Sequence, residues 1–329
     1  MAKTNADGSK SLGRGDLLAI VIGNVIGGGV MTMTGLAIGI TGRSIILSYI
    51  ICAIMVTIVA LPQFFLSATI RMNGGFYTQA AMFGGKWFAG LYSVVFVSYF
   101  FGAATYSISF ADYVLSAFPE INGKLVAFAI LTVFVVLNLT GIQVAAKVQY
   151  AMVIILILAL LVFAGFGFIH LEPGYFSEEQ FFTGGFTGVM SAAALLSMAT
   201  SGTPHFIILT IYVLCSIIIL SGMNIGDVAN IGNTLANCVQ VILCLAIITM
   251  PKKIPEIWKR SQFHINDNAY TFLCILGALV SAAFVYYECL EIQVGHIIGI
   301  FVYLAIACIY PIIRAKFHKI EINISYEEA

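Results

Sequence analysis

Charge is what this sequence has least of. Only 9% of its 329 residues are Asp, Glu, Lys or Arg, whereas ordinary soluble domains carry about a quarter. Apolar residues make up 60% of the chain, and its mean hydropathy is +1.02. A soluble globular domain is therefore excluded, and the composition indicates an integral membrane protein.

The sequence also lacks the residue patterns of several function classes. Its formal net charge is zero, so no basic surface suggests a nucleic acid partner. The seven cysteines have neither metal-binding nor redox spacing, and the histidines show no partner spacing, so we expect no metal site and no cofactor. The sequence shows no combination of a nucleophile, a base and an orienting residue that is typical of an active site. The polar segments are also too short for a catalytic domain. We therefore do not expect an enzyme.

Ten long apolar runs organise the chain. A bilayer core about 30 Å thick needs roughly 20 helical residues, so the sixth and seventh runs are short for a span. We predict an all-α, polytopic membrane helix bundle. The runs cover residues 17–40, 44–70, 88–118, 125–139, 150–169, 186–201, 205–220, 228–250, 270–289 and 295–313.

Basic residues predict the orientation in the membrane. If the N-terminus is cytoplasmic and each run crosses once, every lysine and arginine except Arg43 and Lys124 faces the cytoplasm. This pattern requires the two short runs to count together as an even number of crossings. We expect both termini to be cytoplasmic.

The segment Gly23-Asn24-Val25-Ile26-Gly27-Gly28-Gly29 lies in the middle of the first run. Glycine costs a helix roughly 1 kcal/mol relative to alanine, so we expect the helix to break here. In lipid, unwound backbone is tolerated only where it is buried in protein or lines a cavity, and its free amides could hold a carboxylate. The alternative is that Gly23-x-x-x-Gly27 is a packing face for another helix.

Tyrosines recur every seven residues in the third run, at Tyr92, Tyr99, Tyr106 and Tyr113. Seven residues is nearly two helical turns, so these side chains share one face. Polar groups at membrane depth usually face a bundle interior, which favours a cavity-lining role for Tyr99 and Tyr106. The alternative is an aromatic belt at the interface combined with interhelical hydrogen bonds.

Amide side chains follow one face of the eighth run, and for these we favour helix packing over a site. They are Asn230, Asn233, Asn237 and Gln240. No charged residue falls near the centre of any run, because Asp16, Asp112 and Glu288 lie close to run ends. This argues against a proton relay built on deep carboxylates.

Several motifs together resemble the amino acid, polyamine and organocation (APC) transporter superfamily. They are Ile22-Gly23-Asn24-Val25-Ile26-Gly27-Gly28-Gly29-Val30, Asn73-Gly74-Gly75-Phe76-Tyr77, Phe83-Gly84-Gly85, Leu137-Asn138-Leu139-Thr140-Gly141-Ile142 and Ala146-Lys147-Val148-Gln149. The resemblance implies a LeuT-like fold, in which two inverted five-helix repeats have helices 1 and 6 interrupted at the substrate site. It implies a secondary transporter of amino acids in the plasma membrane, working by alternating access.

The resemblance also implies site residues and partners. The backbone of Ile26, Gly27, Gly28 and Gly29 would hold the substrate carboxylate, and further substrate contacts would come from Tyr99, Tyr106, Ser197 and Ala199. Membrane lipid and a coupling ion, either a proton or sodium, or an exchange substrate are the other implied partners. Residues 150–169 have no lysine of the kind that some proton-coupled members carry, so coupling by such a lysine is not expected.

The middle of the chain departs from the family. Residues 185–201 resemble the outer half of helix 6, and the stretch that begins at Thr203 resembles helix 9. The inner half of helix 6 and helices 7 and 8 are missing, so the second repeat is incomplete. One ambiguity stays open, because residues 195–202 also resemble the family's loop after helix 8, in which case Ser197 and Ala199 are not site residues.

We predict one transporter domain over residues 1–329. It consists of a cytoplasmic tail (1–15), a first five-helix repeat (16–170), a partial second repeat (184–250), two C-terminal helices (269–313) and a second cytoplasmic tail (314–329). Because the mobile bundle and the scaffold of the resembled fold both lose helices, we expect the chain as written not to complete a transport cycle. The alternatives are therefore a non-transporting fragment or accessory protein, or a permease for another small organic amine.

Overall fold

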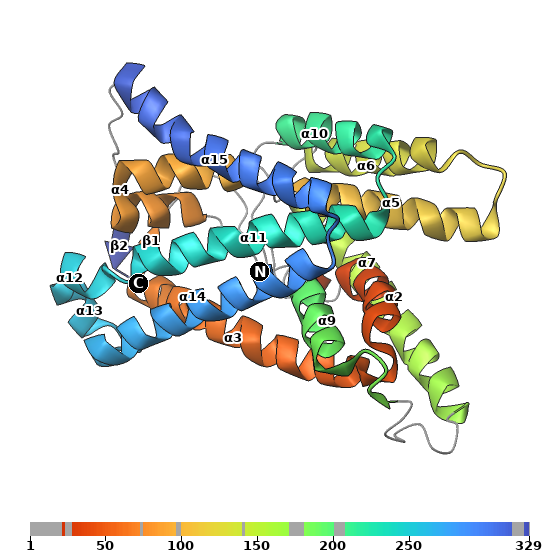
Figure 1. Cartoon of the computed structure of the whole chain (residues 1–329), viewed down its shortest axis with the longest axis horizontal. Helices are drawn as coiled ribbons and strands as arrows, with labels where there is room; N and C mark the ends of the chain where they lie inside the picture. Colours follow the sequence, from red (N-terminus) through yellow and green to blue (C-terminus); the bar gives the residue numbers. More distant parts are fainter. Residues whose placement is uncertain are drawn as a thin grey trace. The chain divides into compact units, whose positions relative to one another are not determined.

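A computed structural model describes residues 22–23, 28–72, 75–96, 100–139, 142–170, 181–200, 208–317 and 326–328 (Figure 1). Apart from two three-residue strands, the regular structure of this part is helical, which confirms the all-α prediction. The elements are α2 (Gly28–Thr41), η1 (Gly42–Ser44), α3 (Ile45–Thr69), β1 (Ile70–Met72), α4 (Gly75–Phe96), α5 (Phe100–Ala117), α6 (Gly123–Leu139), α7 (Ile142–Ile169), α9 (Gly185–Thr200), α10 (Ile208–Ser221), α11 (Ile225–Ile247), α12 (Met250–Lys253), α13 (Pro255–Arg260), α14 (Asp267–Leu290), α15 (Val294–Phe317) and β2 (Tyr326–Glu328).

Six helical stretches in the described residues are long and apolar enough to cross a membrane. Two further apolar helices, Gly123–Leu139 and Gly185–Ser197, are shorter. The chain is therefore a multi-pass membrane protein. The six stretches are Thr32–Thr69, Phe76–Ala117, Lys147–Ile169, Ile225–Lys253, Asp267–Leu290 and Val294–Arg314.

The third apolar run begins later in the sequence than the helix that covers its start. Two helices, α4 and α5, cover it, and residues 97–99 between them lie outside the described part. Helix α4 begins well before the run and bends at Gly85, where φ is 83° and ψ is −172°. Glycine adopts this conformation without the steric cost that a side chain would add. The kink coincides with the Phe83-Gly84-Gly85 motif, which the family resemblance places at the start of a helix.

The chain divides into two compact units, each built from two separate stretches of sequence. Unit 1 comprises Met1–Ser48 and Ala103–Ile225, and unit 2 comprises Tyr49–Gly102 and Gly226–Ala329. In unit 1, α2 packs along α9, and α6 packs against both α10 and α7. The Thr132 and Tyr212 hydroxyls are 3.1 Å apart, and Lys124 Nζ donates to the Leu220 carbonyl at 3.1 Å. These two contacts join α6 to α10.

Unit 2 has a buried core formed by α3, α4, α11, α13, α14 and α15. Trp258 is buried at its centre, with its ring 5.1 Å from that of Tyr270 and its Nε1 donating to Asp267 Oδ1 at 2.8 Å. At Gly277 the three helices α3, α11 and α14 approach closely, because an added Cβ would lie 3.3 Å from Cys244 Sγ and 3.6 Å from the Ile58 carbonyl oxygen. Small residues of this kind let membrane helices pack tightly.

A short antiparallel ladder in unit 2 pairs β1 with β2, and Arg71 faces Glu327 in its register. This pairing was not predicted from the sequence. The segment 314–329 was expected to be a tail, and three-residue strands have too little periodicity to be recognised from sequence.

Candidate functional site

The glycine segment lies at the start of α2. Helix α2 begins at Gly28, and Ile22 and Gly23 are also helical. Ile26 and Gly27 lie outside the described residues, so the helix break between them stays a prediction. Gly28 and Gly29 are the first two described residues of α2. With the predicted break before them, their backbone N–H groups would have no intrahelical acceptors.

Helix α2 packs closely along α9, and Figure 1 shows the two side by side. An added Cβ at Gly184 would lie 2.6 Å from the Ile40 carbonyl oxygen, and one at Gly188 would lie 3.1 Å from the same atom. Ser48 Oγ donates to the Val189 carbonyl at 3.0 Å. Glycines at this junction therefore allow the end of α2 to meet the start of α9.

Because the end of one helix meets the start of the other, α2 and α9 run in opposite directions. A helix rises 1.5 Å per residue, so Gly28 lies roughly 20 Å from Thr41 along α2, and Thr200 lies roughly 18 Å from Gly188 along α9. The beginning of α2 is consequently level with the end of α9. Two separately predicted parts of the site, Gly28 to Gly29 and Ser197 to Ala199, thus belong to the same end of one helix pair.

Of the α9 residues in the predicted site, Ser197 is 6% exposed. Ala199 lies two residues later in the last turn of α9, and only its backbone is described. A buried serine near a helix end can offer its hydroxyl to a neighbouring backbone group or to a ligand.

Tyr106 lies in the part of α5 that belongs to unit 1, with 36% of its surface exposed. Tyr99 lies outside the described residues. Tyr92 belongs to α4 in unit 2, where it is 1% exposed and stacks on Phe96 with ring centroids 5.6 Å apart. Tyr113 is 56% exposed. Tyr92 lies in α4, and Tyr106 and Tyr113 lie in α5, on the two sides of residues 97–99, which are outside the described part.

The amide row on α11 joins helices in unit 2. Gln63 Nε2 of α3 donates to Gln240 Oε1 at 2.6 Å, and Asn237 Nδ2 donates to Glu288 Oε1 of α14 at 2.9 Å. Both amides therefore bond across a helix interface, as the packing interpretation predicts. Glu288 is 1% exposed, although α14 ends two residues later. Its position near the end of an apolar run did not predict this burial.

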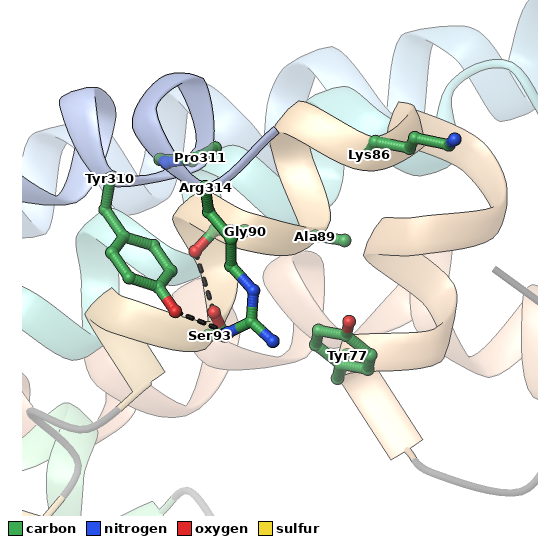
Figure 2. A pocket seen from close by; sticks show the side chains of 8 residues that line it. All are labelled: Tyr77, Lys86, Ala89, Gly90, Ser93, Tyr310, Pro311 and Arg314. Atoms are coloured by element: carbon green, nitrogen blue, oxygen red, sulfur yellow. Dashed lines mark hydrogen bonds between the residues drawn. The ribbon is translucent and has the colours of Figure 1, made fainter. Parts of the chain in front are cut away.

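A pocket of about 230 Å³ opens between α4 and α15 in unit 2 (Figure 2). Arg314 Nη1 donates to the Tyr310 hydroxyl at 2.5 Å, and the guanidinium points toward Tyr310 and Ser93, while Lys86 points away. None of the residues predicted for the substrate site line this pocket. Its lining consists of Tyr77, Lys86, Ala89, Gly90, Ser93, Tyr310, Pro311 and Arg314.

Known proteins are similar to this chain over the region that contains α2 and α9. A family model described as amino acid permease matches residues 12–203, which is more than half of the chain. The branched-chain amino acid permease BcaP of Bacillus subtilis is 26% identical over 214 residues, covering 59% of this chain and 46% of that protein. The probable threonine/serine transporter YbxG of Bacillus subtilis is 23% identical over 261 residues, covering 74% of this chain and 52% of that protein.

The chain thus spans about half the length of the curated relatives it matches. The matched region contains the glycine segment, α2 and all of α9, so the family match and the packed helix pair concern the same residues. Members of this family are transporters rather than enzymes. By this match, together with its apolar helices, the chain belongs to the amino acid permease family of membrane proteins.

Proposed function

We propose that this chain binds an amino acid at the level where α2 begins and α9 ends. The backbone amides of Gly27, Gly28 and Gly29, with Ile26 beside them, hold the substrate carboxylate. A helix N-terminus favours an anion because its first N–H groups point outward and the helix dipole is positive there.

The observation that carries this proposal is the antiparallel packing of α2 on α9. A helix C-terminus has carbonyl groups without intrahelical donors and the negative end of the dipole. An amino acid is a zwitterion, so a helix start and a helix end at one level suit its two charges. Ser197 and Ala199 fall in the turn that would face the ammonium group.

Tyr106 supplies a hydroxyl for the substrate in this proposal, and Tyr99 lies seven residues earlier in the sequence. The side chain of Tyr106 is 36% exposed, whereas that of Tyr92 is enclosed in unit 2. A half-exposed phenol in a membrane helix has a polar end to satisfy, and an aqueous cavity or a ligand satisfies it.

For the family arrangement we propose secondary transport by alternating access in a LeuT-like fold. The protein would lie in the plasma membrane with both termini cytoplasmic. The inverted repeat would comprise residues 16–170 and an incomplete second half from residue 184. A proton, sodium or an exchange substrate would supply the driving force.

Binding without a complete transport cycle is the second candidate, and the length comparison favours it. The chain spans about half of each relative, and the resemblance locates the missing helices after Gly202. A chain of this kind could keep the first repeat and α9 and still lack the helices that close the second gate.

The test is amino acid binding by the purified full chain, measured with a labelled panel that includes branched-chain amino acids, threonine and serine. We expect Gly28→Val to abolish binding, because a β-branched side chain restricts the backbone and blocks close approach to its amides. Tyr106→Phe should weaken binding by about 0.5 to 1.5 kcal/mol.

Gly35→Val is the matched control, because Gly35 lies on the same helix and an added Cβ there meets nothing within 4 Å. It should bind normally. Normal binding by Gly28→Val would move the site elsewhere, and competition by an amine that lacks a carboxylate would favour a permease for organic amines.

A further inference from the structure

Helix α14 carries a carboxyl group that is enclosed by protein inside a membrane-spanning stretch. Glu288 is 1% exposed and lies against α11 in unit 2. An ionised carboxylate in such surroundings costs several kcal/mol unless a cation or several donors compensate it. The partners of this carboxyl therefore decide which protonation state the fold accommodates.

The described partners of Glu288 are neutral. Oε1 accepts one hydrogen bond from Asn237 Nδ2, whereas Oε2 is buried and has no hydrogen-bond partner among the described residues. The titratable side chains that interact with the carboxyl are the thiols of Cys238 on α11 and Cys289 on α14. Neither thiol supplies a positive charge.

Thr234 adds a second constraint from α11. Its side chain lies beside the carboxyl, one turn before Asn237. The hydroxyl donates its hydrogen to the Asn230 carbonyl at 2.8 Å, so toward Glu288 the oxygen can only accept. An acceptor beside the carboxyl suits a group that carries a hydrogen, and it does not suit a carboxylate.

We propose that Glu288 is a buried proton-binding site in unit 2, with Asn237 fixing one carboxyl oxygen and the other oxygen taking the proton. Binding forms an O–H bond on Oε2 from a proton of the aqueous phase, and release returns that proton. No other reactant is needed. The site lies in the unit that does not contain α2 and α9, and it does not depend on the proposed substrate site.

A metal cation fits these surroundings poorly. Sodium, calcium and magnesium take several oxygen ligands, whereas Asn237 turns its N–H donor toward the carboxyl. Among the described residues, no group of three or more His, Cys, Asp or Glu side chains could hold a metal ion.

The polar face of α11 offers the proton a way toward the start of that helix. Asn233 and Asn230 continue the face beyond Thr234, and both are buried. Asn230 Oδ1 has no hydrogen-bond partner in the described structure. Buried polar atoms of this kind are usually satisfied by water, and water beside Asn230 would connect Glu288 with the start of α11 at Ile225.

Infrared difference spectroscopy of the purified full chain tests the proposal. At neutral pH the wild-type protein should show the carbonyl band of a protonated carboxylic acid, and labelling with ¹³C-glutamate should shift that band. Glu288→Gln should remove it. The glutamine can still accept from Asn237 and can donate to Thr234, so this variant reproduces the contacts of the protonated form and should fold.

Glu291→Gln is the matched control, because Glu291 is an exposed glutamate three residues away. It should leave the band unchanged. A spectrum of the labelled wild-type protein without a protonated glutamate band would overturn the proposal without reference to any variant. Thermal stabilisation by sodium over choline that is present in the wild type and lost in Glu288→Gln would replace the proton site with a metal-cation site.

Discussion

Gly90 in α4 lies at a close contact with α15 in unit 2. An added Cβ would lie 2.7 Å from Pro311 Cβ and 3.3 Å from Pro311 Cα on α15. Proline is rigid and the Cα atom belongs to the backbone, so neither neighbour can rotate away. The closeness of α4 and α15 therefore rests on this glycine.

Gly90→Ala should destabilise the protein by about 1 to 3 kcal/mol, because the methyl group overpacks this contact. The measurement is the unfolding midpoint in mixtures of mild detergent and SDS. Gly299→Ala on α15 is the control, since a Cβ there meets nothing within 4 Å. Its midpoint should be unchanged or slightly higher. Equal midpoints for the two variants would contradict the close approach.

Residue-level patterns predict part of the proposed site. Glycines in the middle of an apolar run are recognisable because they are poor helix formers, and the resemblance to the family implies a role for them in holding the substrate. Glu288 could not be recognised in this way. Its burial depends on which helix lies opposite, and nothing near it in the sequence specifies that Asn237 is its partner.

At the scale of elements, the junction of α2, α3 and α9 depends on a buried hydrogen bond. Ser48 is fully buried and donates to the Val189 carbonyl, which lies far away in the sequence. Ser48→Ala should cost about 1 kcal/mol, because the carbonyl loses a donor inside the protein. Thr57→Ala removes a hydroxyl of the same helix that is exposed and bonds only to Ala53, so it should change little.

SDS unfolding of the two variants provides the comparison. If Ser48→Ala unfolds at the same midpoint as Thr57→Ala, the bond between α3 and α9 contributes nothing to stability. Rescue by Ser48→Thr, which keeps a hydroxyl, would separate the loss of the hydrogen bond from the loss of volume.

Most helices could be predicted from the apolar runs, because a membrane helix must be apolar along most of its length. The run 228–250 became α11 (Ile225–Ile247), and the run 270–289 became α14 (Asp267–Leu290). Residues 97–99 lie outside the described part, so the run 88–118 as a single helix stays a prediction. Glycines and polar residues within an apolar stretch leave its hydropathy high, so hydropathy cannot locate the kink at Gly85 in α4.

At the scale of the whole molecule, the proposed orientation predicts which ends of helices face the cytoplasm. Gln293 lies exposed between α14 and α15, and Arg260 lies exposed at the end of α13. A cysteine introduced at Gln293 should react with a membrane-impermeant maleimide on intact cells, because the basic residues then stay inside. A cysteine at Arg260 should react only after permeabilisation.

The parent chain without either new cysteine measures the background from its native thiols, which are buried or half-buried in the described structure. Labelling at Gln293 only from the cytoplasmic side would reverse the orientation. Labelling of both positions on intact cells would mean that α14 does not cross the membrane.

Transport is the second property of the whole molecule. We expect purified chain in liposomes to show no saturable exchange of amino acids above empty vesicles, because the resemblance predicts that helices needed to close one gate are missing after Gly202. Binding by the same preparation shows that the protein is intact. Robust, saturable exchange would show that the described helices suffice for a complete cycle.

The division into two interleaved units also governs the order in which contacts can form during synthesis. Helices α3 and α4 emerge from the ribosome before α11, because residues 103–225 are translated in between. Until α11 arrives, the Gln63 amide has no Gln240 to bond with, although it lies within an apolar helix. An unsatisfied amide in lipid is costly, so a temporary partner such as water or the insertion machinery must accompany α3 through that interval. Replacement of both glutamines by leucine would remove this dependence on the order of translation.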